Sequence, residues 1–176
     1  MYALDAVARR VPAEAWDSPS CCDGWTAREV AGHAASVIKN VGAATGAFPR
    51  PEPQPEAVVA GDDPAAVVSA AVAGTAAALD TQGALQAIAK TPFGEITVDR
   101  FVGILWVDPL THAWDLADAA GIEHGLDAQT ATDAYESLLP VSDSLRGDGR
   151  FSEALEGGPD EVSRLIAFMG RRSVRQ

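Results

Sequence analysis

Alanine dominates long windows of this chain, most clearly the window from Ala65 to Leu79. Alanine has the highest helix propensity of any residue, so these windows favour helix over sheet. Apolar residues make up 47% of the 176 residues, but aromatic residues make up only 6%. The interior must therefore be built mainly from Ala, Val and Leu. A chain of this length can bury such a core within one domain, predicted here as residues 1–176.

Capping residues and apolar periodicity predict helices along most of the sequence. Thr26 and Glu29 have the spacing of a capping box, and Asp63-Pro64 supplies an N-cap with proline at the first helical position. Four principal helices with short additions indicate an all-α bundle. The predicted principal helices are Thr26–Ala44, Asp63–Asp80, Val98–Ala120 and Ala128–Leu139, with shorter helices at Leu4–Val11 and Asp160–Met169.

Proline marks the breaks in this pattern. Phe48–Asp63 is proline-rich and is predicted to be a surface loop or flap. Pro109 interrupts the stripe of Val98–Ala120, so we expect one helix kinked near Leu105–Pro109, or two segments that meet at Asp108 as N-cap. Two further segments carry weaker signals: Thr91–Thr97 could hold a brief strand or turn, and Arg150–Glu156 could be extended.

Charge and hydropathy exclude several classes of function. The net charge of −12 argues against a nucleic-acid partner, because phosphate binding needs clustered Lys and Arg. The first ten residues lack the apolar stretch of a signal peptide. No window reaches the roughly 18 continuous apolar residues that span a bilayer. We therefore expect a soluble, cytoplasmic protein without a membrane partner. The basic cluster of the C-terminus is expected to be a solvated tail that completes the last helix; it comprises Arg171, Arg172 and Arg175.

Cys21 and Cys22 are adjacent. A disulfide between neighbours is strained, so reduced thiols are expected. A role of either thiol as a ligand or nucleophile stays open, but no basic group and no Cys-x-x-Cys spacing supports a lowered thiol pKa.

The candidate functional residues are His33, Asp108 and His112. Asp108 and His112 are four residues apart, so a helix presents them on one face. His33 lies on the apolar stripe of the helix that begins at Thr26. Buried polar groups need partners, and two imidazoles with one carboxylate can hold a divalent metal ion while leaving a coordination position open. The sequence therefore predicts a metal site at these three residues.

Other interpretations remain open for these residues and their neighbours. Each histidine alone is equally consistent with a hydrogen-bonded core residue. Asp115 could orient an imidazole from behind or could be a surface acid, and His124 is expected to be solvent-exposed. Three tryptophans that lie near the candidate ligands in sequence could line a pocket or fill the core: Trp25, Trp106 and Trp114.

Two segments resemble a known family. Residues 18–33 (SPSCCDGWTAREVAGH) and 108–121 (DPLTHAWDLADAAG) resemble the metal-bearing segments of DinB-like four-helix proteins, in the branch of the mycothiol-dependent maleylpyruvate isomerases. Residues 164–171 (RLIAFMGR) resemble the ending of short members. The resemblance implies a DinB-like four-helix bundle with a divalent metal, usually zinc, on His33, Asp108 and His112. Two-histidine, one-carboxylate sites also suit iron, and nickel is left open.

The resemblance also implies a class of chemistry. Related enzymes use the metal to activate a low-molecular-weight thiol such as mycothiol, which then attacks a small electrophile. The isomerases of the family carry glutamate where this chain has Asp108, and a further C-terminal domain that supplies an arginine. The leading hypothesis is a thiol-dependent transferase or isomerase-like enzyme. A non-catalytic metal-binding or small-ligand-binding bundle is the alternative, and a hydrogen-bonded structural bundle is a third. The oligomeric state is left open, a homodimer included.

Overall fold

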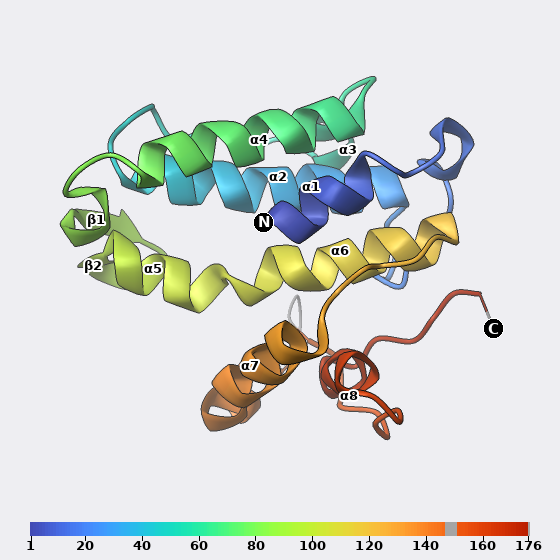
Figure 1. The fold of residues 1–176 in the computed structure, drawn as a ribbon. Helices are drawn as coiled ribbons and strands as arrows, with labels where there is room; N and C mark the ends of the chain where they lie inside the picture. Colours follow the sequence, from blue (N-terminus) through green and yellow to red (C-terminus); the bar gives the residue numbers. More distant parts are fainter. Residues whose placement is uncertain (147–150, 176) are drawn as a thin grey trace.

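The computed structural model describes residues 1–146 and 151–175 and is mainly helical (Figure 1). The predicted all-α class is confirmed, with one small sheet added. The α-helices are α1 Tyr2–Ala8, α2 Ala27–Ala44, α3 Glu56–Ala60, α4 Pro64–Leu79, α5 Val98–Leu105, α6 Val107–Ala120, α7 Ala128–Leu138 and α8 Glu161–Phe168. The 3₁₀ turns are η1 Ala13–Ala15, η2 Ala84–Gln86 and η3 Leu139–Leu145, and the strands are β1 Ile88–Thr91 and β2 Gly94–Thr97.

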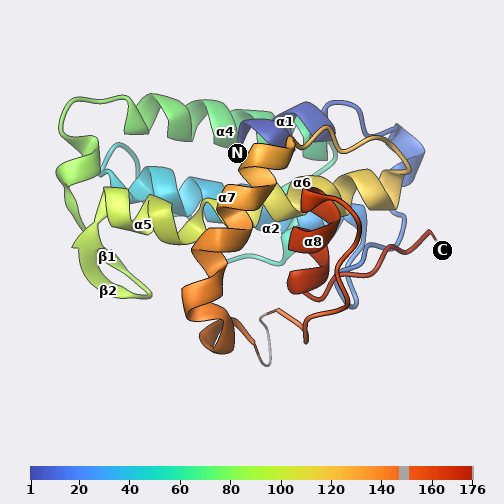
Figure 2. The same ribbon diagram turned by 60° about the horizontal axis from the view of Figure 1, so that its bottom comes forward.

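Four helices form the bundle: α1, α2, α4 and α6 (Figure 1). Helix α2 packs against α4 and α6, and the short α1 fills the space between α4 and α6. The predicted fourth bundle helix, Ala128–Leu139, instead becomes α7 and packs with α8 outside the bundle, against α6 (Figure 2). Helix α1 is the fourth helix of the bundle instead. Leu4 and Val7 on its inner face are almost entirely buried there.

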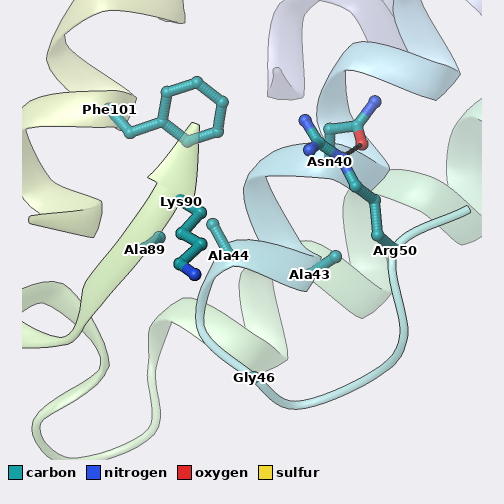
Figure 3. Close-up of a pocket in the computed structure, with 8 residues that line it drawn as sticks. All are labelled: Asn40, Ala43, Ala44, Gly46, Arg50, Ala89, Lys90 and Phe101. Carbon is teal, nitrogen blue, oxygen red and sulfur yellow. Dashed lines mark hydrogen bonds between the residues drawn. The ribbon is translucent and has the colours of Figure 1, made fainter. Parts of the chain in front are cut away.

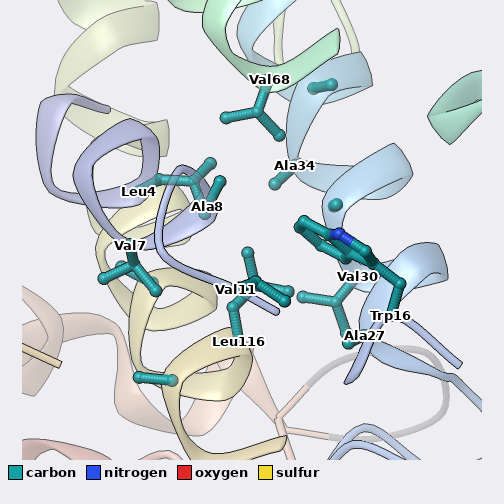
Figure 4. Packing of buried hydrophobic residues seen from close by; sticks show 14 of the residues in the cluster. Leu4, Val7, Ala8, Val11, Trp16, Ala27, Val30, Ala34, Val68 and Leu116 are labelled. Carbon is teal, nitrogen blue, oxygen red and sulfur yellow. The ribbon is translucent and has the colours of Figure 1, made fainter. Parts of the chain in front are cut away.

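The bundle core consists mainly of small aliphatic side chains (Figure 4). Leu4, Val30, Val68 and Leu116 meet at its centre and are fully buried. Several alanines of α2 and α4 are buried between the helices. Small side chains allow helix axes to approach closely, since the interaxial distance depends on the residues at the contact. The expectation of an interior built from Ala, Val and Leu is confirmed.

Helix ends follow the predicted capping signals. The Thr26 hydroxyl accepts from the Glu29 backbone N–H, and the Glu29 carboxylate accepts from the Thr26 N–H, which completes the capping box. Asp63 caps α4 through its carboxylate, which accepts from the Ala66 backbone N–H. Helix α6 ends at Gly121, whose φ of 72° is the left-handed conformation that glycine adopts without strain. The start of α2, which carries His33, is thus fixed locally.

The helix break near Pro109 is confirmed: it falls within the predicted range Leu105–Pro109, although not at Asp108. Helix α5 ends at Leu105 and α6 begins at Val107, so the two meet at Trp106 rather than at Asp108. Pro109 has no N–H, and its ring conflicts with the carbonyl of Leu105 four residues earlier. Asp108 is therefore not the N-cap; it lies in the first turn of α6, where it faces α2.

One connecting segment is more ordered than expected, a second forms a strand as expected, and a third lies partly outside the described residues. The loop Phe48–Asp63 contains the short helix α3. Thr91–Thr97 belongs to an antiparallel hairpin of β1 and β2. Of the predicted extended segment Arg150–Glu156, residue 150 is outside the described part, and Phe151 forms one isolated bridge. Within the part of the chain described, no helix combines the length and hydropathy needed to cross a bilayer.

Gly32 on α2 allows α3 to lie directly against the bundle. A Cβ at this position would overlap the backbone carbonyl of Glu56. We expect Gly32→Ala to lower the free energy of unfolding by about 1–3 kcal/mol, because α3 must shift to admit the methyl group. Gly74→Ala is the matched control: it also replaces a helical glycine, but no atom lies within 4 Å of the added Cβ. The control should be neutral or stabilising by up to about 1 kcal/mol. Urea denaturation measures both, and equal effects would contradict the close packing of α3.

Candidate metal centre

His33, Asp108 and His112 come together where α2 crosses α6. The Nε2 atoms of His33 and His112 lie 3.7 and 3.6 Å from the same Asp108 oxygen, Oδ2. The two imidazole rings are 5.1 Å apart between centroids and nearly perpendicular. One donor atom from each residue lies within 4.8 Å of the other two. The three residues singled out from the sequence therefore share one site.

This site is closed on one side and accessible on the other. The side chain of His112 is only 7% exposed, whereas those of His33 and Asp108 are 30% and 26% exposed. The indole of Trp25 lies against His33, with ring centroids 5.0 Å apart. A small molecule could therefore reach the donors from the side of His33 and Asp108.

Asp108 is incompletely satisfied by the described residues around it. Its Oδ1 is buried and has no hydrogen-bond partner. Its Oδ2 contacts the two imidazoles at distances longer than a normal hydrogen bond. Buried polar atoms nearly always have partners, so an orphaned carboxylate oxygen between two imidazoles requires an explanation. A cation bound to all three donors is the simplest partner that fits.

The electrostatics of the three residues are strongly coupled. Burial alone would raise the pKa of Asp108, but attraction to His112, helped by His33, outweighs burial and holds that pKa well below its usual range. Burial alone would lower the pKa of His112, but Asp108 and further hydrogen bonds raise it well above its usual value. Without a metal, the raised pKa of His112 and the lowered pKa of Asp108 both favour an imidazolium paired with a carboxylate. A divalent cation would displace the imidazolium proton.

Asp115 supports His112 from behind. The carboxylate is fully buried, and His112 Nδ1 lies 2.8 Å from its Oδ2. With Nδ1 engaged, His112 presents Nε2 to Asp108. The interpretation of Asp115 as a residue that orients an imidazole is confirmed, and the surface alternative is wrong. Burial would raise the pKa of Asp115, but Arg171 and His112 hold it well below its usual range.

Arg171 corrects the expectation of a solvated C-terminal tail. Its side chain is only 12% exposed, and its Nε donates to both oxygens of Asp115, at 2.9 and 3.2 Å. Arg172 and Arg175 are exposed, as expected. The tail is tied to α6 a second time, because Ser173 Oγ donates to Asp118 at 2.6 Å. Helical periodicity relates residues a few positions apart, so it could not pair Arg171 with Asp115, 56 positions earlier. The sequence offered one indication of such a partner: Asp115 lies on the inner face of the helix and has no Lys or Arg within one turn.

Cys21 and Cys22 also converge on Asp115. The two thiols are free, and their Sγ atoms lie 3.0 and 3.4 Å from Oδ1 and Oδ2 of Asp115 respectively. Contrary to the sequence interpretation, basic groups do lie near them in space, since Arg171 and His112 contact the same carboxylate. The hydrogen bond from Cys21, helped by His112, lowers the pKa of Cys22 to about 6, while the same bond and burial raise the pKa of Cys21.

A separate hollow lies at the far end of α2, beside the β1–β2 hairpin (Figure 3). It has a volume of about 180 Å³, and the side chains of Arg50, Lys90 and Phe101 border it. Asn40, also on its wall, accepts a hydrogen bond from Arg50. The first residue of α2 that lines this hollow, Asn40, is seven residues after His33, which corresponds to about 10 Å of helix. It is therefore not part of the histidine–aspartate site.

Fold and site together define a class: all-α bundle proteins that carry a histidine–carboxylate cluster between two of their helices. Within that class, the chain belongs to the family of the mycothiol maleylpyruvate isomerase N-terminal domain, whose model matches residues 1–117. Two uncharacterized proteins of Mycobacterium tuberculosis, from strains CDC 1551 / Oshkosh and ATCC 25618 / H37Rv, are each 30% identical over 173 residues. The alignment covers 96% of this chain and 92% of each relative. No solved structure matches.

The matched region contains the three candidate ligands and Asp115, whereas Arg171 lies beyond it. The pairing of Asp115 with Arg171 therefore joins the matched region to the part of the chain beyond it.

Proposed function

We propose that His33, Asp108 and His112 hold a divalent metal ion, most simply zinc, and that the protein is a thiol-dependent transferase or isomerase-like enzyme. The thiol would be a low-molecular-weight one of the mycothiol type, and the second substrate a small electrophile. The orphaned Oδ1 of Asp108, between two imidazoles on neighbouring helices, is the observation that carries the proposal. Membership of a mycothiol-related family supports the choice of thiol.

The donor set fits such an ion. Two imidazoles and one carboxylate are common ligands of zinc, and three protein ligands leave a position open for a substrate. Nickel and iron accept the same donors, so zinc is the first metal to test. Asp115 and Arg171 keep His112 in place, as residues behind a metal ligand commonly do.

A divalent ion at this site would lower the pKa of a coordinated thiol, so that the thiol becomes nucleophilic at neutral pH. The residues of the chain supply access and orientation. His33 and Asp108 leave the donors open to solvent on one side. Trp25 covers His33 and gives an incoming ligand an aromatic surface.

An apolar cavity of about 110 Å³, lined by residues that neighbour His33 and Asp108 along their helices, would suit a nonpolar part of the electrophile. Val37, one helical turn after His33, forms one wall, and Leu105 and Pro109 form another next to Asp108. Few polar atoms line this cavity, so it offers contact area without hydrogen-bonding partners. A small electrophile with one apolar substituent is therefore the substrate class we favour.

Calorimetric titration of the zinc-loaded protein with mycothiol tests the first step. We expect saturable binding that a chelator abolishes and that His33→Ala weakens by at least tenfold. Conversion of a fluorogenic halogenated bimane, followed with mycothiol present, then tests for group transfer. Binding without faster conversion of any electrophile tried would favour the alternative, a non-catalytic metal- or ligand-binding bundle. Equal binding with and without metal would contradict the proposal.

A further inference from the structure

The two adjacent cysteines lie outside the proposed His33–Asp108–His112 site but share the buried carboxylate behind it. Cys21 Sγ is 3.0 Å from Oδ1 of Asp115, and Cys22 Sγ is 3.4 Å from Oδ2. Both thiols are half-buried and unbridged, and the donor atoms of the three residues all lie within 4.8 Å of one another. Two thiols and a carboxylate so close together are a second set of metal-ligand atoms.

We infer that Cys21, Cys22 and Asp115 form a second cation site, selective for soft divalent ions of the zinc and cadmium type. Thiolate sulfur is the protein ligand that such ions prefer. This site needs none of His33, Asp108 or His112 as a ligand. It would therefore exist whether or not the proposed enzymatic function is correct.

The distances suit an ion placed between the three donors. Zinc binds sulfur at about 2.3 Å and carboxylate oxygen at about 2.0–2.2 Å, so a tetrahedral angle separates the two ligand atoms by about 3.6 Å. The observed separations of 3.0 and 3.4 Å are shorter than this value and run to different oxygens of Asp115. To bind one ion, the thiols must therefore move slightly apart and turn toward the carboxylate oxygen that takes it. Their partial exposure leaves room for water as a fourth ligand.

The charges also balance. Asp115 and Arg171 already neutralise each other in the buried pair. Binding releases one proton from each thiol to solvent and places one divalent ion between the two thiolates, so the net charge of the cluster is unchanged. Arg171 holds the carboxylate by its Nε throughout. Because Asp115 also contacts His112, an ion here would influence the neighbouring histidine site.

Cadmium titration of the reduced, metal-free protein tests the inference. Thiolate ligation to cadmium gives an ultraviolet charge-transfer absorption that imidazole and carboxylate ligation does not give. For the wild type we expect this absorption with saturation at one thiolate-bound ion per chain. Cys21→Ser/Cys22→Ser should lose the absorption, and it should lower total bound cadmium by one equivalent.

His33→Ala/His112→Ala is the matched variant for the other site. This variant should keep the charge-transfer absorption but lose the cadmium ion that binds without thiolates. The two measurements therefore show separately whether each proposed site exists. A thiol count and circular dichroism before titration establish that both cysteines are reduced and that each variant is folded. Folded wild type with two free thiols that gives no charge-transfer absorption would overturn the second site.

Discussion

Asp115→Asn is expected to lower the free energy of unfolding by about 3–5 kcal/mol, because it leaves the Arg171 guanidinium buried without its counter-charge. Asp115 is fully buried and the Arg171 side chain only 12% exposed, so little solvent is available to replace the lost partner. The substitution keeps the size of the side chain, so the loss reflects charge and hydrogen bonding rather than a cavity. Urea denaturation with a linear extrapolation measures it.

Arg171→Met and Arg172→Met provide a matched pair for this prediction. Arg171→Met removes the other partner of the buried ion pair and should cost a similar amount. Arg172 is the exposed neighbour, and its substitution should change stability by no more than about 0.5 kcal/mol. If Asp115→Asn and Arg171→Met were as mild as Arg172→Met, the buried pair would not stabilise the fold.

The same pair predicts a pH dependence. Since Arg171 and His112 hold the pKa of Asp115 below its usual value of 3.8, the carboxylate stabilises the fold fully above that pH. The contribution is lost as the pH falls from 3.8 toward the lowered pKa of the folded state. The difference in stability between wild type and Asp115→Asn should therefore shrink in that acidic range and stay constant from there up to the usual histidine pKa of 6.5; above it, the loss of the proton that Asp115 helps to hold on His112 adds a second pH dependence.

Removal of metal is expected to lower the melting temperature by about 5–10 °C. A ligand that binds only the folded state adds about 2.7 kcal/mol at a hundredfold excess over its dissociation constant. For a chain of this size, each kcal/mol corresponds to about 2–4 °C. The histidine site joins α2 to α6, so an ion there would link two helices that are distant in sequence. Differential scanning calorimetry of zinc-loaded protein, with and without a strong chelator, measures the change, and added zinc should reverse it.

Variants identify which site carries this stabilisation. His33→Ala and His112→Ala should each remove the response to chelator, because two remaining ligands hold the ion poorly. Cys21→Ser/Cys22→Ser should keep most of it, since the histidine site is intact. If the two histidines were only hydrogen-bonded core residues, the chelator would have no effect while both substitutions still destabilised the protein. Identical melting curves for metal-loaded wild type with and without chelator would contradict the prediction.

Local signals predicted most of the helices and selected three residues that the fold brings together. The Thr26–Glu29 capping box and the end of α6 at Gly121 depend only on residues a few positions apart. Local sequence is therefore sufficient to predict both. The spacing of Asp108 and His112 on one helical face is equally local. His33 could be assigned to an inner face by periodicity, and only the crossing of α2 and α6 brings it to the other two.

Long-range partnerships could not be predicted in this way. Arg171 looked like part of a solvated basic tail, and its burial depends on how the chain after α8 returns to α6. Cys21 and Cys22 lacked basic neighbours in sequence, but the fold places Arg171 beside the carboxylate that they contact. Helix α1 takes the place in the bundle that was predicted for Ala128–Leu139. Its seven residues gave too short a pattern to predict that one of its faces would be buried in the core.

An anomalous-scattering map at the zinc absorption edge, from crystals grown with zinc in excess over both proposed sites, tests the central claim most directly. The account predicts a peak about 2.0–2.2 Å from an imidazole nitrogen of His33, an imidazole nitrogen of His112 and a carboxylate oxygen of Asp108. Zinc found only at the cysteines, or no peak among the three donors in fully zinc-loaded crystals, would contradict it.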